Sequence, residues 1–295
     1  MLSSFDLLST CKDTPLIVSQ YVVWFVLFGL FGWVFESAYC SITEKRWCNR
    51  GFLFGPVCPI YGAGAVAAIA VFGSPAVEAL APSPVAVFFI CAAGASAIEW
   101  VTSIVLEHAF GTVWWDYSNL PLNLNGRICV PAATLFGAAG LGVVYIAIPL
   151  VRIVSAAVSP LAFETCALVC TAVLAADTTL TVCTLTEVLA AIERAEAELN
   201  QRVQATFDEV QATIGDAHAA VVEGADRLIE TGSERAERLR EGGAERLGAI
   251  AGHLNARQQH ILHNARRFTN KGRGVAARRL TDALDALLQR KGGKR

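Results

Sequence analysis

Residues 130–151 read VPAATLFGAAGLGVVYIAIPLV, a run without a single charged side chain. An α-helix needs about 20 mostly apolar residues to cross the hydrocarbon core of a bilayer. Four further segments are apolar over a similar length, namely residues 16–40, 52–72, 85–106 and 160–185. The sequence therefore predicts an all-α, polytopic membrane protein with a five-helix transmembrane domain in residues 1–185.

The composition agrees with this class of protein. Hydrophobic residues make up 54% of the chain, charged residues only 17%, and the mean hydropathy is +0.46. Soluble domains are usually about one quarter charged. Charge is also segregated, because 18 of the 24 Lys and Arg residues follow residue 192. An apolar first part is therefore followed by a charged last part.

The basic residues predict how the helices are oriented. Lys45, Arg46 and Arg50 lie between the first two predicted helices, and Arg127 lies between the third and fourth. Cytoplasmic loops of membrane proteins carry an excess of Lys and Arg. We therefore expect a multi-pass plasma-membrane protein with its amino terminus outside and its carboxyl terminus in the cytoplasm.

The charged last part divides into two predicted segments. Residues 186–250 are expected to form an acidic amphipathic helix, and residues 251–295 a basic, partly disordered tail. Apolar positions recur in steps of eleven at Ile192, Val203, Ile214, Ala225, Ala236 and Leu247. This period favours a straight or slightly right-handed coiled coil over a strict heptad. The stripe is expected to pack on itself or on a second copy of the chain.

The basic tail has three interpretations that the sequence leaves open. Residues 246–295 carry 12 basic and 2 acidic side chains. Such a tail is attracted to the anionic lipids of the inner leaflet and equally to nucleic acid. It can also be a solvated end without a partner.

Carboxylates inside predicted spans are the first candidates for function, because a charge in hydrocarbon is costly. Their depth follows from a rise of about 1.5 Å per residue, which puts three of them in the cytoplasmic half of the bilayer. Loop residues of both signs adjoin them. The predicted polar cluster consists of Glu36, Arg50, Glu99, Asp116, Arg127 and Asp177. It is either a substrate or ion site or a set of ion pairs that locks the helices together.

The second predicted span contains a broken-helix motif. Its residues are Gly55, Pro56, Pro59, Tyr61 and Gly62. Two prolines three residues apart cannot continue a regular helix without losing backbone hydrogen bonds. Irregular backbone at membrane depth survives only where it is buried in protein or lines a polar cavity. The motif therefore points to a cavity beside the polar cluster, as in transporters with broken helices.

No recognisable catalytic or metal-binding motif is present, so we expect neither an enzyme nor a bound cofactor. The nine Cys residues show no C-x-x-C spacing, and the chain lacks G-x-S-x-G and H-E-x-x-H. It also lacks the phosphate loop G-x-x-x-x-G-K-[ST]. Any ATP-driven role therefore requires a separate ATPase subunit.

Six long motifs resemble the bacterial family called putative ABC-transporter type IV, a family of ABC transporter permeases. They are GWVFE (32–36), NRGFLFGP (49–56), CPIYG (58–62), EWVTS (99–103), WWDY (114–117) and NLNGR (123–127). The resemblance extends over about residues 20–200, and Asp177 falls where that family carries an acid in its last span. It implies a membrane protein with a role in transport. The segment after residue 200 departs from the family.

These observations predict a membrane transport component, either a permease or a permease-associated subunit. Its polar site would lie on the cytoplasmic side, and the expected partners are the bilayer, an ATPase subunit and further copies of the chain. Two alternatives remain at this stage. One is a membrane-embedded enzyme that acts on lipid head groups, and the other is a scaffold whose cytoplasmic helix recruits partners.

Overall fold

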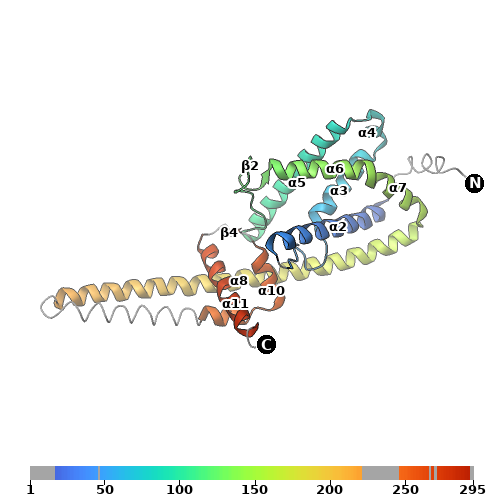
Figure 1. Cartoon of the computed structure of the whole chain (residues 1–295). Helices are drawn as coiled ribbons and strands as arrows, with labels where there is room; N and C mark the ends of the chain where they lie inside the picture. Colours follow the sequence, from blue (N-terminus) through green and yellow to red (C-terminus); the bar gives the residue numbers. More distant parts are fainter. Residues whose placement is uncertain (1–16, 46, 221–245, 266, 269–270, 293–295) are drawn as a thin grey trace, which may run out of the picture. The chain divides into compact units, whose positions relative to one another are not determined.

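The computed structural model describes residues 17–45, 47–220, 246–265, 267–268 and 271–292 (Figure 1). The chain is mostly helical, at 81%, which confirms the all-α prediction. It divides into two compact units. The first comprises residues 1–109 and 113–183, and the second comprises residues 110–112 and 184–295.

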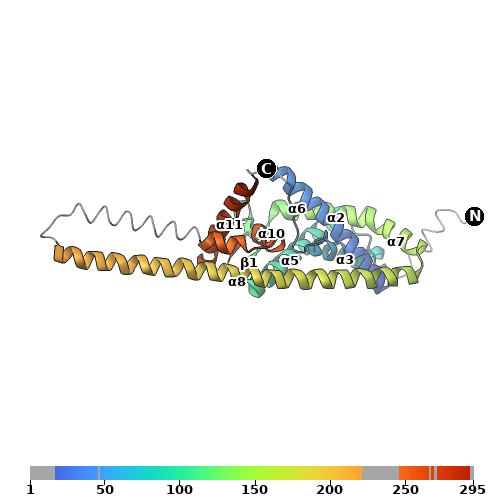
Figure 2. The same ribbon diagram turned by 90° about the horizontal axis from the view of Figure 1, so that it is seen from below.

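The first unit is built from helices and three short strands. Its elements are α2 (Val18–Glu44), α3 (Pro59–Phe72), α4 (Pro75–Leu80), α5 (Pro84–Phe110) except its last residue, the second residue of β1 (Thr112–Val113), β2 (Asn123–Leu124), β3 (Ile128–Cys129), α6 (Val130–Gly142), the π-helical turn η1 (Val143–Ala147), α7 (Ile148–Ala157) and the beginning of α8 (Pro160–Ala220). Helix α8 is continuous over its 61 residues (Figure 2).

Within the described residues, four helical segments are long and apolar enough to cross a membrane. They are Val18–Thr43, Pro84–Phe110, Val130–Ala157 and Pro160–Glu209. The second predicted span is represented by α3, which has 14 residues. A helix of this length extends about 21 Å, less than the roughly 30 Å of a hydrocarbon core. Four of the five predicted spans therefore have the required length. That the second predicted span crosses the membrane stays a prediction.

The short length of α3 follows from its prolines. Pro56 and Pro59 cannot donate a backbone hydrogen bond, and Pro59 occupies the first turn of α3, where none is needed. The preceding backbone is irregular and finds partners elsewhere. The Cys58 amide donates to the carbonyl of Gly29 on α2 at 2.9 Å. The backbone before α3 is irregular where the motif lies, and α2 satisfies part of it.

Close helix packing in this unit depends on glycine. A Cβ atom at Gly32 would lie 2.3 Å from the Tyr61 ring, and one at Gly62 would lie 2.5 Å from the Phe25 carbonyl. Small residues let helix backbones approach closely within membranes. The two glycines therefore hold α2 against α3, as Gly140 does for α6 against Cys91 of α5.

The long helical segment Val130–Ala157 contains the π-helical turn η1, which has a local cause. η1 precedes Pro149, which lies in the first turn of α7. Proline lacks the amide hydrogen and clashes with the carbonyl four residues earlier. Widening the previous turn relieves this conflict while the helix continues.

A buried apolar core joins the ends of several helices in the first unit. Its members are Trp24, Ile69, Phe72, Val87, Ile148 and Val151. Polar contacts surround it. Arg152 forms an ion pair with Glu78 at 2.6 Å and donates to the Gly73 carbonyl at 2.8 Å. These bonds fix α4 against α7 at the end of the bundle where residues 73–83 lie.

The second unit contains the last part of α8 together with α10 (Ala256–Asn264), β4 (Arg267–Phe268) and α11 (Lys271–Gly292). Its fully buried side chains include Leu185, Ile192, Ile261 and Leu280. Gln258 donates to Glu187 at 2.8 Å and Arg273 pairs with Glu193 at 2.5 Å. These contacts join α10 and α11 to α8.

The predicted apolar stripe is buried at two of its described positions and exposed at another. Ile192 is 0% and Leu247 7% exposed, whereas Val203 is 55% exposed. Ala225 and Ala236 lie outside the described residues. The helical character of residues 186–220 and the presence of α10 and α11 beyond residue 251 are observed, while the coiled coil and the partly disordered tail stay predictions.

Candidate functional site: a buried carboxylate at an apolar cavity

Glu99 on α5 is a deeply buried carboxylate, with only 4% of its surface exposed. Its Oε1 atom accepts a hydrogen bond from the Tyr117 hydroxyl at 3.1 Å. Its Oε2 atom is buried and has no hydrogen-bond partner in the part of the chain that the structure describes. Because a buried acceptor without a donor costs about 1–3 kcal/mol or more, Oε2 is a position where a bound donor would be stabilised.

Glu99 lines a cavity of about 410 Å³ between α2, α3, α5 and α6. The wall is largely apolar. Its aromatic members are Phe28, Phe31, Phe35, Tyr61, Phe72 and Phe136. Small residues such as Gly94 and Ala95 provide the space, and a Cβ atom at Gly94 would meet no heavy atom within 4 Å. Size and lining are those of a small-molecule site, with few polar groups on an apolar surface.

A second carboxylate lies next to this cavity. Glu36 on α2 accepts a hydrogen bond of 2.6 Å from the hydroxyl of Tyr61, which itself lines the cavity. The charge of Glu36 acts electrostatically on both Glu99 and Tyr117. Glu36, Tyr61, Glu99 and Tyr117 therefore form one group, termed here the carboxylate cluster.

Tyr117 enters the cluster from the loop between α5 and α6. Burial raises its pKa far above the ordinary value, and the charge of Glu99 raises the pKa further. A tyrosine in this state keeps its proton at physiological pH and acts as a hydrogen-bond donor. Tyr117 is thus a fixed donor to Glu99.

A tight hairpin positions Tyr117. Asn125 and Gly126 both have positive φ, at 52° and 69°, and the Arg127 amide donates to the Leu124 carbonyl at 3.1 Å. These features define a type I′ turn, for which Asn-Gly is the preferred sequence. The Gly126 carbonyl accepts a 2.8 Å hydrogen bond from the Tyr117 amide. The NLNGR motif therefore fixes the backbone of the tyrosine that contacts Glu99.

Asp116 stabilises the same loop through hydrogen bonds to a neighbouring residue. Its Oδ1 atom accepts from the Ser118 amide at 3.0 Å and from the Ser118 hydroxyl at 2.5 Å. This pattern stabilises a turn through the side chain. Asp116 is exposed and is not part of the cavity wall. It shapes the loop that carries Tyr117.

Arg127 pairs with Glu107, a carboxylate that does not belong to the carboxylate cluster. It forms an ion pair with Glu107 and donates to the Ser103 hydroxyl at 2.9 Å. Its guanidinium lies 5.7 Å from the centre of the Trp100 ring, within the range of a cation–π interaction. Three residues of α5, spaced three and four positions apart, therefore hold Arg127 along one face of that helix.

Arg50 and Asn49 attach the loop after α2 to its surroundings. The Arg50 guanidinium donates to the Trp114 carbonyl at 3.1 Å, and its amide donates to the buried Ser37 hydroxyl at 3.2 Å. Asn49 accepts a 2.6 Å hydrogen bond from the Trp33 indole. The NRG motif thus joins α2 to the loop that follows α5.

Asp177 directly stabilises the irregular backbone that precedes α3. Its Oδ1 and Oδ2 atoms accept hydrogen bonds from the amides of Phe54 and Gly55 at 3.2 and 2.9 Å. A Cβ atom at position 55 would lie 2.8 Å from the carboxylate, so only glycine permits this approach. The acid on α8 therefore supplies acceptors to two amides of the irregular segment before α3.

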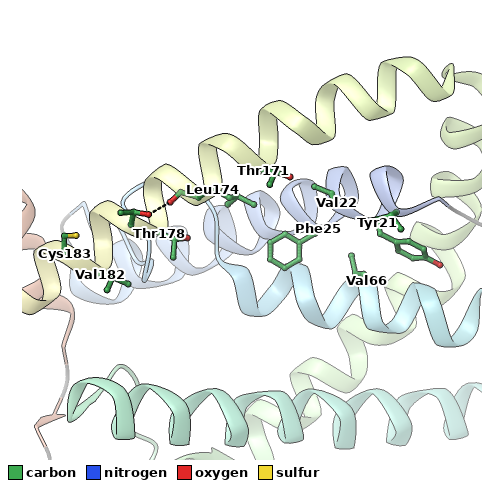
Figure 3. A pocket seen from close by; sticks show the side chains of 12 residues that line it. Tyr21, Val22, Phe25, Val66, Thr171, Leu174, Thr178, Val182 and Cys183 are labelled. Carbon is green, nitrogen blue, oxygen red and sulfur yellow. Dashed lines mark hydrogen bonds between the residues drawn. The ribbon is translucent and has the colours of Figure 1, made fainter.

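A larger open groove of about 870 Å³ lies between α2, α3 and α8. Figure 3 shows Thr171, Leu174 and Val182 on α8 across from Tyr21 and Phe25 on α2. Hydroxyl groups are its polar lining, and no charged side chain belongs to it among the described residues. It offers an apolar surface without a group that would select a solute.

Within the described residues, no group of three or more His, Cys, Asp or Glu side chains is arranged to hold a metal ion.

A family model supplies the comparison that places this chain among known proteins. The model described as “Putative ABC-transporter type IV” matches residues 23–182. The chain belongs to this family. No curated protein and no solved structure matches the chain. The type IV match ends within one residue of the first unit and contains the cavity, the carboxylate cluster and the loops that hold it.

The predicted site residues of this type IV protein divide into three roles. Glu36 and Glu99 meet at the cavity, Arg50, Arg127 and Asp177 fasten loops and helices, and Asp116 stabilises a turn. Sequence reasoning missed Tyr117 and Glu107 as functional partners. Tyr117 stands in the WWDY motif, which was the available signal, whereas nothing in the sequence pairs Glu107 with Arg127.

Proposed function

We propose that this type IV family member is a membrane transport component, a permease or permease-associated subunit, and that its cavity beside Glu99 binds a small solute. The single observation that carries the proposal is the buried, unpartnered carboxylate oxygen of Glu99 in a cavity of about 410 Å³. Intramembrane carboxylates that face a cavity commonly mark substrate or ion pathways.

The site is proposed to open toward the cytoplasm. Lys45, Arg46, Arg50 and Arg127 lie in the two loops next to the carboxylate cluster, whereas residues 74–84 contain no basic side chain. The excess of basic residues in cytoplasmic loops supports this orientation. With α3 as a fifth crossing, the amino terminus is outside and the carboxyl terminus is in the cytoplasm.

Energy for transport is proposed to come from a separate ATPase subunit. Membership of an ABC-transporter family supports such a partner, and the chain has no phosphate loop of its own. Purification of the tagged chain from its native membrane tests this proposal. A co-purifying protein with a phosphate loop is expected, and a lone homo-oligomer or a lipid-modifying turnover would contradict it.

The arginines favour transport over the alternative of an enzyme for lipid head groups. Such an enzyme needs a cationic group to hold the phosphate beside its acid–base pair. Arg127 is paired with Glu107, and Arg50 donates to the Trp114 carbonyl. Neither of them lines the cavity. This distribution supports a solute site over a phosphate site, and non-enzymatic action over catalysis.

Substitution of Glu99 by Gln tests the role of the site itself. The variant keeps the size of the side chain and an oxygen that accepts from Tyr117, but it removes the charge. We expect growth or transport that depends on this protein to be lost while the variant inserts at normal levels. If Glu99→Gln is instead degraded or aggregates, the carboxylate has a structural role and the proposed solute site is contradicted.

A further inference from the structure

We propose that the cavity selects an amphipathic cation, a molecule with one ammonium group and an apolar body. The inference rests on the proposed function, because it takes the cavity as the solute site and names the class of solute. Four features of the wall support it: the charge of Glu99, the distribution of bases, the aromatic rings and the exposed side.

The charge of the cavity is of one sign. Glu99 is its ionisable carboxylate, Glu36 adds charge nearby, and no Lys, Arg or His belongs to the described lining residues. Arg127, which lies in the turn after β2, is held by Glu107 and Ser103 of α5. Burying a charge without a partner is costly. A bound cation would compensate this charge, whereas a bound anion would add to it.

The hydrogen bonds of the cluster leave room for one more donor at the cavity. A carboxylate can accept about four hydrogen bonds, and Glu99 accepts one, from Tyr117, among the described residues. The Tyr61 hydroxyl is directed to Glu36 at 2.6 Å and so does not serve Glu99. Oε2 of Glu99 therefore remains for a donor that comes with the solute, as the N–H of an ammonium group does.

The rest of the wall suits an apolar body attached to that ammonium group. Tyr61 and Phe136 pack edge to face at the wall, with ring centres 5.8 Å apart. Aromatic faces attract ammonium groups within about 6 Å. Apart from Glu99 and the aromatic rings, the lining consists of Ala, Gly, Ile, Val, Leu and Cys residues. A purely hydrophilic ion would leave this surface without a complementary partner.

The exposed side of the cavity wall also favours an amphipathic molecule. Three large side chains of the cavity wall, Phe31, Ile90 and Leu135, are 67, 50 and 51% exposed. They belong to α2, α5 and α6, which the composition assigns to the membrane. Large exposed apolar side chains on spanning helices face lipid. A solute that partitions into the bilayer can therefore reach Glu99 from the side.

Three probes with the same apolar body and different head groups test the inference. They are 4-phenylbutylamine, 4-phenylbutan-1-ol and 4-phenylbutanoate, which at pH 7 are cationic, neutral and anionic. The full chain is reconstituted in phosphatidylcholine nanodiscs, and binding is measured by isothermal titration calorimetry with empty nanodiscs subtracted. We expect the amine to bind at least about 10-fold more tightly than the alcohol, since hydrogen bonds to charged groups are the stronger class, and the carboxylate to bind most weakly.

Two variants and a control identify which feature of the cavity causes the binding and the preference for the amine. Glu99→Gln should reduce the preference for the amine over the alcohol to less than about 3-fold, because the charge is the selecting feature. Gly94→Phe should weaken all three probes, because a side chain there has free space to fill the cavity. Glu164→Gln, at an exposed carboxylate on α8, should leave binding unchanged. Circular dichroism of each variant verifies that the fold is retained.

Several results would overturn the inference. Equal binding of amine and alcohol, tightest binding of the carboxylate, or an amine preference that persists in Glu99→Gln excludes the cation as the selected class. If Gly94→Phe still abolishes binding in those cases, the cavity remains a solute site and the proposed function stands. Absence of binding by all three probes overturns the inference as well. Co-purification of an ATPase tests the transport proposal independently.

Discussion

At the scale of single residues, the site depends on which donor faces which acceptor. Glu99 and Glu36 each receive a tyrosine hydroxyl, at 3.1 and 2.6 Å. Arg127 instead satisfies Glu107. The two kinds of partner have different consequences, because a neutral donor leaves the carboxylate with its charge while an arginine cancels it. The cavity wall therefore contains an acidic side chain that has no basic partner among the described residues.

Replacing Tyr117 by Phe should destabilise the protein by about 1–3 kcal/mol, because Glu99 would lose a donor while remaining buried. Thermal unfolding in detergent, followed by circular dichroism, measures the change. Tyr39→Phe on α2 is the matched control, since that side chain is 62% exposed, and it should stay within about 0.5 kcal/mol of the parent. A Tyr117→Phe variant as stable as the control would show that the hydrogen bond contributes nothing.

The Arg127–Glu107 pair is predicted to be coupled by about 1–2 kcal/mol, between the values of exposed and buried pairs, because each side chain is 20% exposed. A double-mutant cycle of Arg127→Ala and Glu107→Ala measures this energy. The double variant should be more stable than the sum of the single losses predicts. Additive losses, within about 0.5 kcal/mol, would mean that the pair does not hold the loop to α5.

At the scale of elements, an irregular segment is kept in place by an acid from a distant helix. Residues 52–58 precede α3, and Asp177 on α8 accepts the amides of Phe54 and Gly55. The type I′ hairpin after β2 has a similar role for Tyr117. In both cases the loop backbone, and not a regular helix, determines where the functional side chains lie.

Asp177→Ala should loosen the irregular segment of residues 52–58 without unfolding the protein. The amides of Phe54 and Gly55 would lose an acceptor that is worth about 1.5–3 kcal/mol, since it is charged. Hydrogen–deuterium exchange of a peptide that covers residues 52–58 should become at least about tenfold faster, by the usual 1.4 kcal/mol per factor of ten. Glu164→Ala on the same helix is the control. Unchanged exchange at residues 54 and 55 in Asp177→Ala would contradict the assigned role.

The elements also show what the sequence could predict. Long apolar runs identify α2, α5, α6–α7 and α8, and Pro56 with Pro59 predicts the irregular backbone before α3. The partners in the site were not predictable. Arg127 reaches Glu107 because the turn between β2 and β3 determines its position, and Asp177 lies more than 120 positions from the amides it binds. Spacing along the chain carries no information about such pairs.

At the scale of the whole molecule, orientation is the feature that decides how the site is reached. A short epitope inserted after Trp47, whose side chain is 74% exposed, should be detected only after spheroplasts are permeabilised. An epitope inserted after Pro82 should be detected on intact spheroplasts. This follows from the excess of basic residues in the first loop. The reverse pattern would place the carboxylate cluster near the outer face and would exclude a cytoplasmic site.

The claim that the cavity beside Glu99 holds a solute is tested most directly by native mass spectrometry. The parent protein and the Gly94→Phe and Glu99→Gln variants are purified gently from the native membrane and compared for bound small molecules. A molecule that carries an ammonium group is expected on the parent protein and on neither variant. The same bound molecules on all three proteins would contradict the claim.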